Sequence, residues 1–241
     1  MKRINTYEYS AAPENTDFNG RITVPSLCGQ MISAISRNIR TEGYGLDVMA
    51  KENMSWILIR SAFEIDFRPE LYSDIYIEVW PVPGNGLTYH RCVRMTDSAG
   101  MELGRGTTEW CVIDRDSRKP VFPDLKDGGA GLELPCRGPR RIRDFNPEVE
   151  NTRRIGYTDC DFNGHLNNVR YVDMMFDMLP EHIIGATDPL RLDINYKHEV
   201  LRGTDISTGL RHGSPDEILF IARTPDHTLC SASITRKDSI S

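Results

Sequence analysis

Long hydrophobic runs, clustered cysteines and an excess of positive charge are all missing from this 241-residue sequence. Without a run of about 18 apolar residues, we expect no transmembrane helix. The six cysteines are widely scattered and form no C-x-x-C pair, so we expect reduced thiols and no zinc site. The net charge of −6 argues against general nucleic-acid binding. No pattern in the sequence indicates a metal ion or an organic cofactor.

The N-terminal residues lack the hydrophobic core of a secretion signal. They also lack the long leader, rich in serine and arginine, that a plastid protein would carry, so we expect a cytoplasmic protein. Hydrophobic residues make up 39% of the chain and charged residues 27%, which is typical of a globular protein. The length suits one large domain or two domains of about 120 residues each.

The tetrapeptide Asp-Phe-Asn-Gly occurs twice, at residues 17–20 and 161–164. A predicted strand, at 3–10 or 153–158, precedes each copy. Apolar residues at helical spacing follow each copy, namely Val24, Leu27, Met31, Ala34 and Ile35 after the first and Leu166, Val169, Val172, Phe176 and Leu179 after the second. The two halves therefore repeat one plan of strand, turn and long helix.

Alternating patterns and turn residues predict a meander of four antiparallel strands after each helix. The expected strands are 56–66, 75–80, 87–95 and 104–114 in the first half, and 190–196, 204–210, 218–223 and 229–235 in the second half. A helix followed by such a meander predicts an α+β fold in which a curved sheet wraps the helix.

Residues 115–150 change character, because prolines and the glycine-rich run 128–131 break regular structure there. We therefore expect a first domain at 1–120, a linker at 121–150 and a second domain at 151–241.

Residues 157–171 concentrate polar side chains of the kind that carry chemistry. Asp161, Asn163 and His165 place a carboxylate, an amide and an imidazole at i, i+2 and i+4, which a hydrolase of esters or thioesters needs. We expect Asn163 to cap the following helix, so that backbone N–H groups near Gly164 and His165 bind an oxyanion. The alternative is that these residues only cap the helix. A histidine held neutral at a helix start can transfer protons near neutral pH.

The pattern Asp-x-Asn-x-His-x-Asn-Asn-x-x-Tyr at 161–171 resembles the signature of acyl-acyl-carrier-protein (acyl-ACP) thioesterases, double-hotdog enzymes that release fatty acids from the carrier protein. Segments 56–60, 108–114 and 196–199 also resemble family segments, in the family's order. The resemblance implies an α+β fold of two tandem hotdog modules, an acyl carrier protein carrying a fatty acyl chain as partner, and no cofactor or metal. It implies four catalytic residues, all in the second module: Asp161, Asn163, His165 and Glu199.

This sequence departs from the family pattern at Val200, where plant members have a cysteine directly after the glutamate. A cysteine mechanism at that position is therefore excluded. The first half also has Arg21 in place of the histidine, and its segment 67–69 offers no acid in register. We expect one active site, in the second module, while the first module shapes the acyl-chain pocket.

The resemblance implies that His165 and Glu199 activate water, while Asp161 acts as a second base or as a nucleophile. Three other functions remain open: hydrolysis of acyl-coenzyme A, non-catalytic acyl binding, and dehydration of hydroxyacyl chains. Retention of all four polar residues in one half favours catalysis over binding. The sequence leaves the preferred acyl chain undetermined, and both a monomer and a homodimer are compatible with it.

A local basic cluster lies in and just beyond the expected linker and consists of Arg137, Arg140, Arg141, Arg143, Arg153 and Arg154. On a protein of net negative charge, such a cluster is either a solvated linker or a docking surface for an acidic carrier protein.

Overall fold

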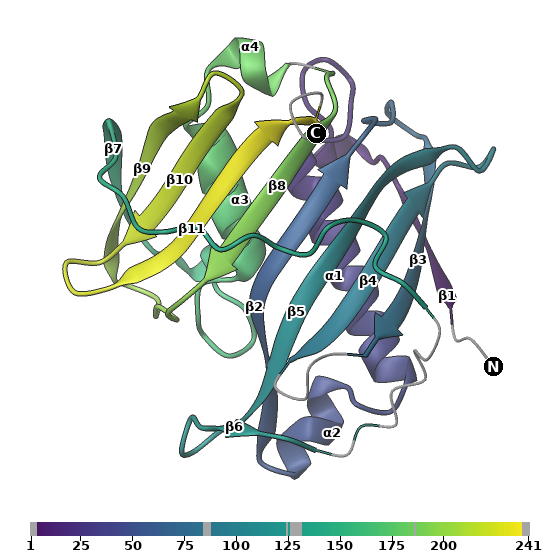
Figure 1. Ribbon diagram of the computed structural model, residues 1–241, viewed down its shortest axis with the longest axis vertical. Helices are drawn as coiled ribbons and strands as arrows, with labels where there is room; N and C mark the ends of the chain where they lie inside the picture. The colour runs from purple at the N-terminus through teal and green to yellow at the C-terminus, as the bar shows by residue number, and fades with distance from the viewer. Residues whose placement is uncertain (1–3, 84–87, 124, 126–131, 186, 238–241) are drawn as a thin grey trace. The chain divides into compact units, whose positions relative to one another are not determined.

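The computed structural model describes residues 4–83, 88–123, 125, 132–185 and 187–237. The chain forms two compact units, Met1–Pro139 (unit 1) and Arg140–Ser241 (unit 2), and the boundary falls inside the expected linker 121–150. Each unit combines an α-helix with an antiparallel sheet (Figure 1). The expected α+β fold of two tandem hotdog modules is therefore confirmed. None of the helices in the described ranges is long and apolar enough to cross a bilayer.

The described strands of unit 1 follow the order β1-β3-β4-β5-β2, with β6 beside β5. Its elements are β1 (Asn5–Ser10), the 3-10 turn η1 (Pro13–Asn15), α1 (Val24–Thr41), α2 (Leu46–Lys51), β2 (Met54–Ile65), β3 (Asp74–Val82), β4 (Tyr89–Thr96), β5 (Glu102–Asp114) and β6 (Pro120–Val121). The strands correspond to those predicted from alternation. Arg3 and Leu87, which begin two of the predicted strands, lie outside the described residues.

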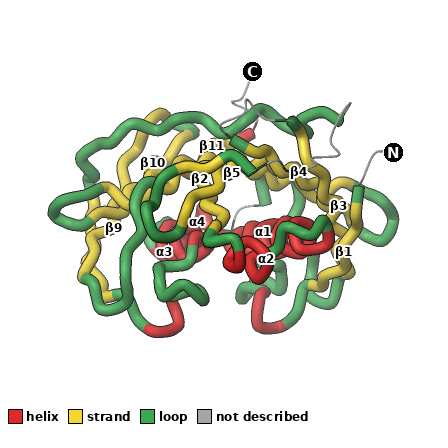
Figure 2. Tube along the Cα trace, turned by 90° about the horizontal axis from the view of Figure 1, so that it is seen from below, coloured by secondary structure: helices red, strands yellow, loops and turns green. Residues whose placement is uncertain are grey.

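Helix α1 forms where the sequence offers both a start and a stop signal. The Thr23 hydroxyl accepts a hydrogen bond from the Ser26 amide at 3.1 Å, and Pro25 occupies the first turn. After the helix, Gly43 takes a left-handed φ of +89°, which favours glycine. The apolar stripe packs against β1, β3 and β4 (Figure 2). Its fully buried members include Leu27, Met31, Ala34 and Ile35.

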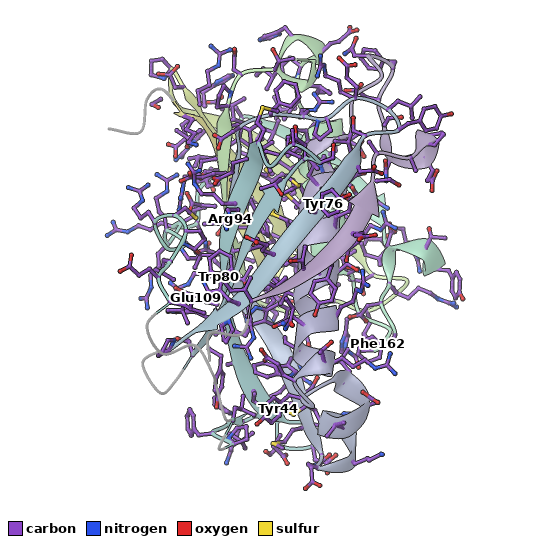
Figure 3. The ribbon with its side chains drawn as sticks, turned by 90° about the vertical axis from the view of Figure 1, so that its right-hand side faces the viewer. Tyr44, Tyr76, Trp80, Arg94, Glu109 and Phe162 are labelled. Atoms are coloured by element: carbon purple, nitrogen blue, oxygen red, sulfur yellow. The ribbon has the colours of Figure 1, made fainter. Side chains whose placement is uncertain are left out.

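The sheet of unit 1 has an inner face, which is turned toward α1, and an outer face, because side chains alternate along each strand. Ile75, Ile77 and Val79 of β3 are fully buried on the inner face. On the outer face, Arg60 of β2 donates to Glu109 of β5 at 2.7 Å. Figure 3 labels four outer-face residues, which are Tyr76, Trp80, Arg94 and Glu109.

The described strands of unit 2 follow the order β8-β11-β10-β9-β7. Its elements are β7 (Val149–Arg154), the 3-10 turn η2 (Tyr157–Asp159), α3 (Asn168–Asp177), α4 (Glu181–Ile184), β8 (Leu190–Tyr196), β9 (Asp205–Ser214), β10 (Glu217–Arg223) and β11 (Thr228–Arg236). Helix α3 has 10 residues, against 18 in α1, and ends before Pro180 as predicted. The ring of its Tyr171 lies 6.1 Å from that of Tyr196 on β8.

Parts of the expected linker are bonded to or buried against the sheets. In unit 1, the indole of Trp80 donates to the Glu133 carbonyl at 3.0 Å. In unit 2, the Ile142 amide donates to the Asn195 side chain at 3.0 Å, and Ile142 is buried together with Phe145. Polar side chains of β8 therefore fix this segment. The run 128–131 lies outside the described residues.

Candidate active site

A closed turn at residues 161–165 sets the geometry of the candidate site. One carboxylate oxygen of Asp161, Oδ1, accepts hydrogen bonds from the amides of Asn163 at 2.8 Å and His165 at 3.3 Å. The Gly164 amide donates to the Asp161 carbonyl at 3.0 Å, and the Asp161 amide donates to the His165 carbonyl at 2.8 Å. Gly164 has a φ of +78°, which an L side chain would resist. The Asp161 carboxylate is thus fixed within the turn.

The predicted helix cap at Asn163 is wrong. The cap is Asn167, whose side chain accepts from the Val169 amide at 3.1 Å, and α3 begins at Asn168. The Asp161 carboxylate already satisfies the amides after it, and the Leu166 amide donates to the Val200 carbonyl at 2.9 Å. The helix therefore starts only after this turn and the bridge at residues 165–166.

The prediction that the backbone amides of Gly164 and His165 bind an oxyanion is also wrong. Both amides point into the turn, that of Gly164 to the Asp161 carbonyl and that of His165 to the Asp161 carboxylate. Neither is therefore available to a substrate oxygen. The Asn163 side chain, in contrast, is exposed and makes no hydrogen bond with the described part of the chain. Its amide group is a donor in this turn that can meet an oxyanion.

Glu199 reaches His165 because two segments distant in sequence meet there. His165 forms a backbone bridge with Leu201, and Leu166 bonds to Val200. These contacts place Nδ1 of His165 3.7 Å from Oε1 of Glu199. Their side chains are 25% and 39% exposed, so water and substrate can reach both. All four predicted site residues therefore belong to the turn or to the segment bridged to it.

Asp159 is a structural residue of the site whose role the sequence did not reveal. Its carboxylate accepts two hydrogen bonds from Arg153, at 2.7 and 2.8 Å, and one from the Gly156 amide at 2.8 Å. Its carbonyl accepts from the Asn167 amide at 2.9 Å. Asp159 is only 8% exposed and links β7 to the helix start, so it holds the turn in place.

Unit 1 contains the same turn but has different side chains at the positions of His165 and Glu199. Asp17 accepts from the amides of Asn19 at 2.9 Å and Arg21 at 3.2 Å, and Gly20 has a φ of +70°. The Ile22 amide bonds to the Pro69 carbonyl just as Leu166 bonds to Val200. This register places Arg21 at the position of His165 and Arg68, directly before Pro69, at the position of Glu199.

The unit 1 turn is closed by an ion pair between Arg68 and Asp17. Nη2 of Arg68 bonds to Oδ2 of Asp17, and both side chains are 7% exposed. Burial by itself raises the pKa of Asp17, but the bond from Arg68 and the amides of Arg21 and Asn19 outweigh it and hold that pKa below its ordinary value. In unit 2 no such arginine is present, and Oδ2 of Asp161 has no partner among the described residues.

No group of three or more His, Cys, Asp or Glu side chains in the described ranges is arranged to hold a metal ion. The six cysteines are free thiols. Cys160, next to Asp161, bonds through its sulfur to the Gly156 carbonyl at 3.4 Å.

Comparison with known families covers both units. Residues 3–125 match the family described as acyl-ACP thioesterase N-terminal domain, and residues 144–236 match the acyl-ACP thioesterase C-terminal domain. The chain belongs to the acyl-ACP thioesterase family. An oleoyl-acyl carrier protein thioesterase of Coriandrum sativum is 25% identical over 248 residues, covering 92% of this chain and 66% of the relative. Oleoyl-acyl carrier protein thioesterase 2 of Arabidopsis thaliana is 20% identical over 224 residues, with 83% and 61% covered.

Solved structures share the fold of this acyl-ACP thioesterase family member. An acyl-ACP thioesterase of Bacteroides thetaiotaomicron superposes with a TM-score of 0.87 and 25% identity, covering 96% of this chain and 97% of that one. The 12:0-ACP thioesterase of Umbellularia californica superposes with a TM-score of 0.82 and 15% identity, with 96% of each chain covered. This chain spans about two thirds or less of the length of the two plant relatives named above.

Proposed function

We propose that this protein hydrolyses acyl-ACP to a free fatty acid and the carrier protein, as part of fatty acid biosynthesis. The observation that carries the proposal is the contrast between the two turns. Unit 1 fills the histidine and glutamate positions with arginines and seals its aspartate in an ion pair. Unit 2 keeps Asp161, Asn163, His165 and Glu199 together, with the imidazole and the glutamate accessible to water. Family membership supports the same reaction.

In the proposed mechanism, Glu199 faces Nδ1 of His165 and orients the imidazole. Nε2 of His165 then takes a proton from the attacking water. The distance of 3.7 Å exceeds that of a hydrogen bond, and such contacts commonly shorten when substrate binds. The Asn163 amide donates to the thioester oxygen as negative charge develops on it. Asp161 acts as a second base or as the nucleophile.

Thiol release from a panel of thioesters tests this function directly. The panel pairs each acyl chain with acyl carrier protein and with coenzyme A. We expect hydrolysis of carrier-linked chains at a higher kcat/KM than of the coenzyme A thioesters. Faster cleavage of the coenzyme A series would identify an acyl-coenzyme A thioesterase instead. Well-folded protein that binds acyl chains but cleaves neither series would be an acyl-binding protein.

Part of the basic cluster supports an acidic carrier protein as the partner. Three of its arginines are engaged within unit 2, since Arg140 bonds to Glu217, Arg153 to Asp159 and Arg154 to Asp205. Arg141 and Arg143, in contrast, are exposed on the segment packed against β8. Asp144, the next residue, bonds to Lys197, two residues before Glu199. These two cations are therefore placed to attract an acidic protein toward the site.

Changing both Arg141 and Arg143 to glutamate is expected to raise KM for acyl-ACP about tenfold at low salt, with little effect on kcat. Electrostatic steering acts on encounter and weakens as salt screens it, so the loss is expected to shrink at high ionic strength. A neutral acyl-N-acetylcysteamine thioester serves as the uncharged substrate and is expected to be cleaved equally well. Arg115 and Lys119, exposed in unit 1, provide the matched charge-reversal control. Equal losses in both double variants would refute local docking.

A further inference from the structure

Two cysteines of unit 1 that are distant in sequence meet at one threonine side chain. The sulfur of Cys136 lies 3.6 Å from the hydroxyl oxygen of Thr107 on β5. The same hydroxyl bonds to the thiol of Cys92, which is the cross-strand partner of Thr107 on β4. Opposed residues on neighbouring antiparallel strands have their Cβ atoms about 5 Å apart. Both thiols therefore face one hydroxyl group.

The segment before Cys136 crosses the outer face of the unit 1 sheet at this point. Trp80 of β3, which lies on the outer face (Figure 3), is opposed to Cys92, and Cys92 is opposed to Thr107, so the three form one row. The chain is bonded to both ends of the row, through the Glu133 carbonyl at Trp80 and through Cys136 at Thr107. The strands at the two ends are about 10 Å apart, and three residues of extended chain span about the same distance. The segment 133–136 therefore passes over β4 at Cys92.

The two thiols differ in their access to solvent. Cys92 is 0% exposed although it lies on the outer face, whereas Cys136 is partly exposed. A small reagent in solution therefore meets Cys136 first. Burial is the main reason that the pKa of Cys92 is raised to about 12, and the nearby Cys136 also raises it. At neutral pH the Cys92 thiol is thus protonated and reacts only with a group that is held beside it.

We propose that Cys92 and Cys136 form an oxidation site, at which a low-molecular-weight disulfide of the glutathione type converts the two thiols to a reversible protein disulfide. The Cys136 thiolate attacks one sulfur of the reagent, forms a mixed disulfide and releases one small thiol. The Cys92 sulfur then attacks the Cys136 sulfur, loses its proton and releases the second small thiol. Two electrons pass from the two cysteines to the reagent. The second step is intramolecular, so the fixed position of Cys92 beside Cys136 offsets its protonation.

The new bond joins β4 to the segment that ends unit 1 at Pro139. A disulfide that closes a long loop removes conformational freedom from the unfolded chain and so stabilises the folded one. We therefore expect the oxidised protein to melt about 5–10 °C higher than the reduced protein. The site makes the stability of unit 1 depend on the thiol–disulfide balance around the protein. This dependence goes beyond the proposed function, because it holds whichever thioester the protein cleaves.

The test incubates the native protein with excess oxidised glutathione and measures its intact mass, its disulfide-linked peptides and its melting temperature. We expect wild-type protein to lose two hydrogen atoms, to yield a peptide that joins Cys92 to Cys136, and to return to the reduced form with dithiothreitol. Cys136→Ser should fold, because its side chain is partly exposed, and should show neither the linked peptide nor the rise in melting temperature. Cys92→Ala should stop at a glutathione adduct on Cys136.

Cys111 of β5 is also partly exposed and lies in the same unit, so Cys111→Ser is the matched control and should form the bond as wild-type protein does. Wild-type protein that does not react, or that keeps a glutathione adduct on Cys136 without forming the bond, would overturn the oxidation site. A bond that forms only in urea would overturn it as well, because the two thiols would then meet only in the unfolded chain. None of these measurements uses a thioester, so they are independent of the proposed function.

Discussion

His165→Ala is expected to lower kcat for acyl-ACP hydrolysis about a thousandfold, as loss of a general base does. The imidazole is partly exposed and its ion-pair contact is with Glu199 at 3.7 Å, so the fold should be unaffected. Glu199→Gln should cost about a hundredfold, because the amide no longer stabilises the protonated imidazole. The double variant should be no worse than His165→Ala alone, since residues that act as a unit are not additive. Steady-state thiol release measures all three.

Asp161→Asn separates the chemistry of Asp161 from its structural role. The amide oxygen of asparagine can still accept from the amides of Asn163 and His165, so the turn should persist while activity falls about a thousandfold. Cys160→Ala is the neighbouring control and should retain wild-type activity. Retention of more than about a tenth of the activity in both His165→Ala and Asp161→Asn would place the site elsewhere. Single turnover in isotopically labelled water then distinguishes the two roles, because label in the Asp161 carboxylate indicates a covalent intermediate.

Much of the fold could be predicted because the same local signals occur twice. The repeated Asp-Phe-Asn-Gly turn and the apolar stripes that follow it fix the turn and a helix in each unit by short-range effects. The strand predicted at 153–158 lies instead at Val149–Arg154, and a 3-10 turn follows it at Tyr157–Asp159. The length of α3 could not be predicted in this way. Its start depends on the bond from Leu166 to the Val200 carbonyl, a contact between residues 34 positions apart. The preference of asparagine for the cap position therefore predicted a cap at Asn163. With the tertiary contact in place, the cap is Asn167 and the helix begins at Asn168.

In the candidate site, too, residues close in sequence could be predicted and contacts between distant residues could not. Asp161, Asn163 and His165 could be read together because they are close in sequence. Glu199 came from family resemblance, since it is brought near by the bridge from His165 to Leu201 and the bond from Leu166 to Val200. The sequence showed that the first half lacks an acid in register, but not what replaces it. The ion pairs of Arg68 with Asp17 and of Arg140 with Glu217 join residues that are far apart in sequence, so local patterns could not reveal them.

Arg68→Met is expected to lower the free energy of unfolding of unit 1 by about 3–5 kcal/mol, the cost of leaving a buried charge without its partner. The side chains of Asp17 and Arg68 are each 7% exposed, so the ion pair is largely shielded from water. The double variant Asp17→Asn, Arg68→Met should recover most of the loss, because the uncompensated charge is gone. All three tryptophans, Trp56, Trp80 and Trp110, are in unit 1, so tryptophan fluorescence during urea unfolding reports this unit.

The loss in Arg68→Met should also depend on pH with a definite sign. In wild-type protein the pKa of Asp17 lies below its ordinary value of 3.8, so its contribution to stability is present above that value and is lost as pH falls through the folded pKa. Without Arg68, burial of the Asp17 carboxylate is opposed less and raises the pKa of Asp17. Protonation of Asp17 therefore stabilises the variant as pH falls. The difference between the two proteins should therefore be largest near neutral pH and shrink toward about pH 4. The exposed pair Arg154–Asp205 is the control, and Arg154→Met should cost less than about 1 kcal/mol. A loss in Arg68→Met as small as this control would mean that the unit 1 turn is held by its backbone bonds and not by the ion pair between Arg68 and Asp17.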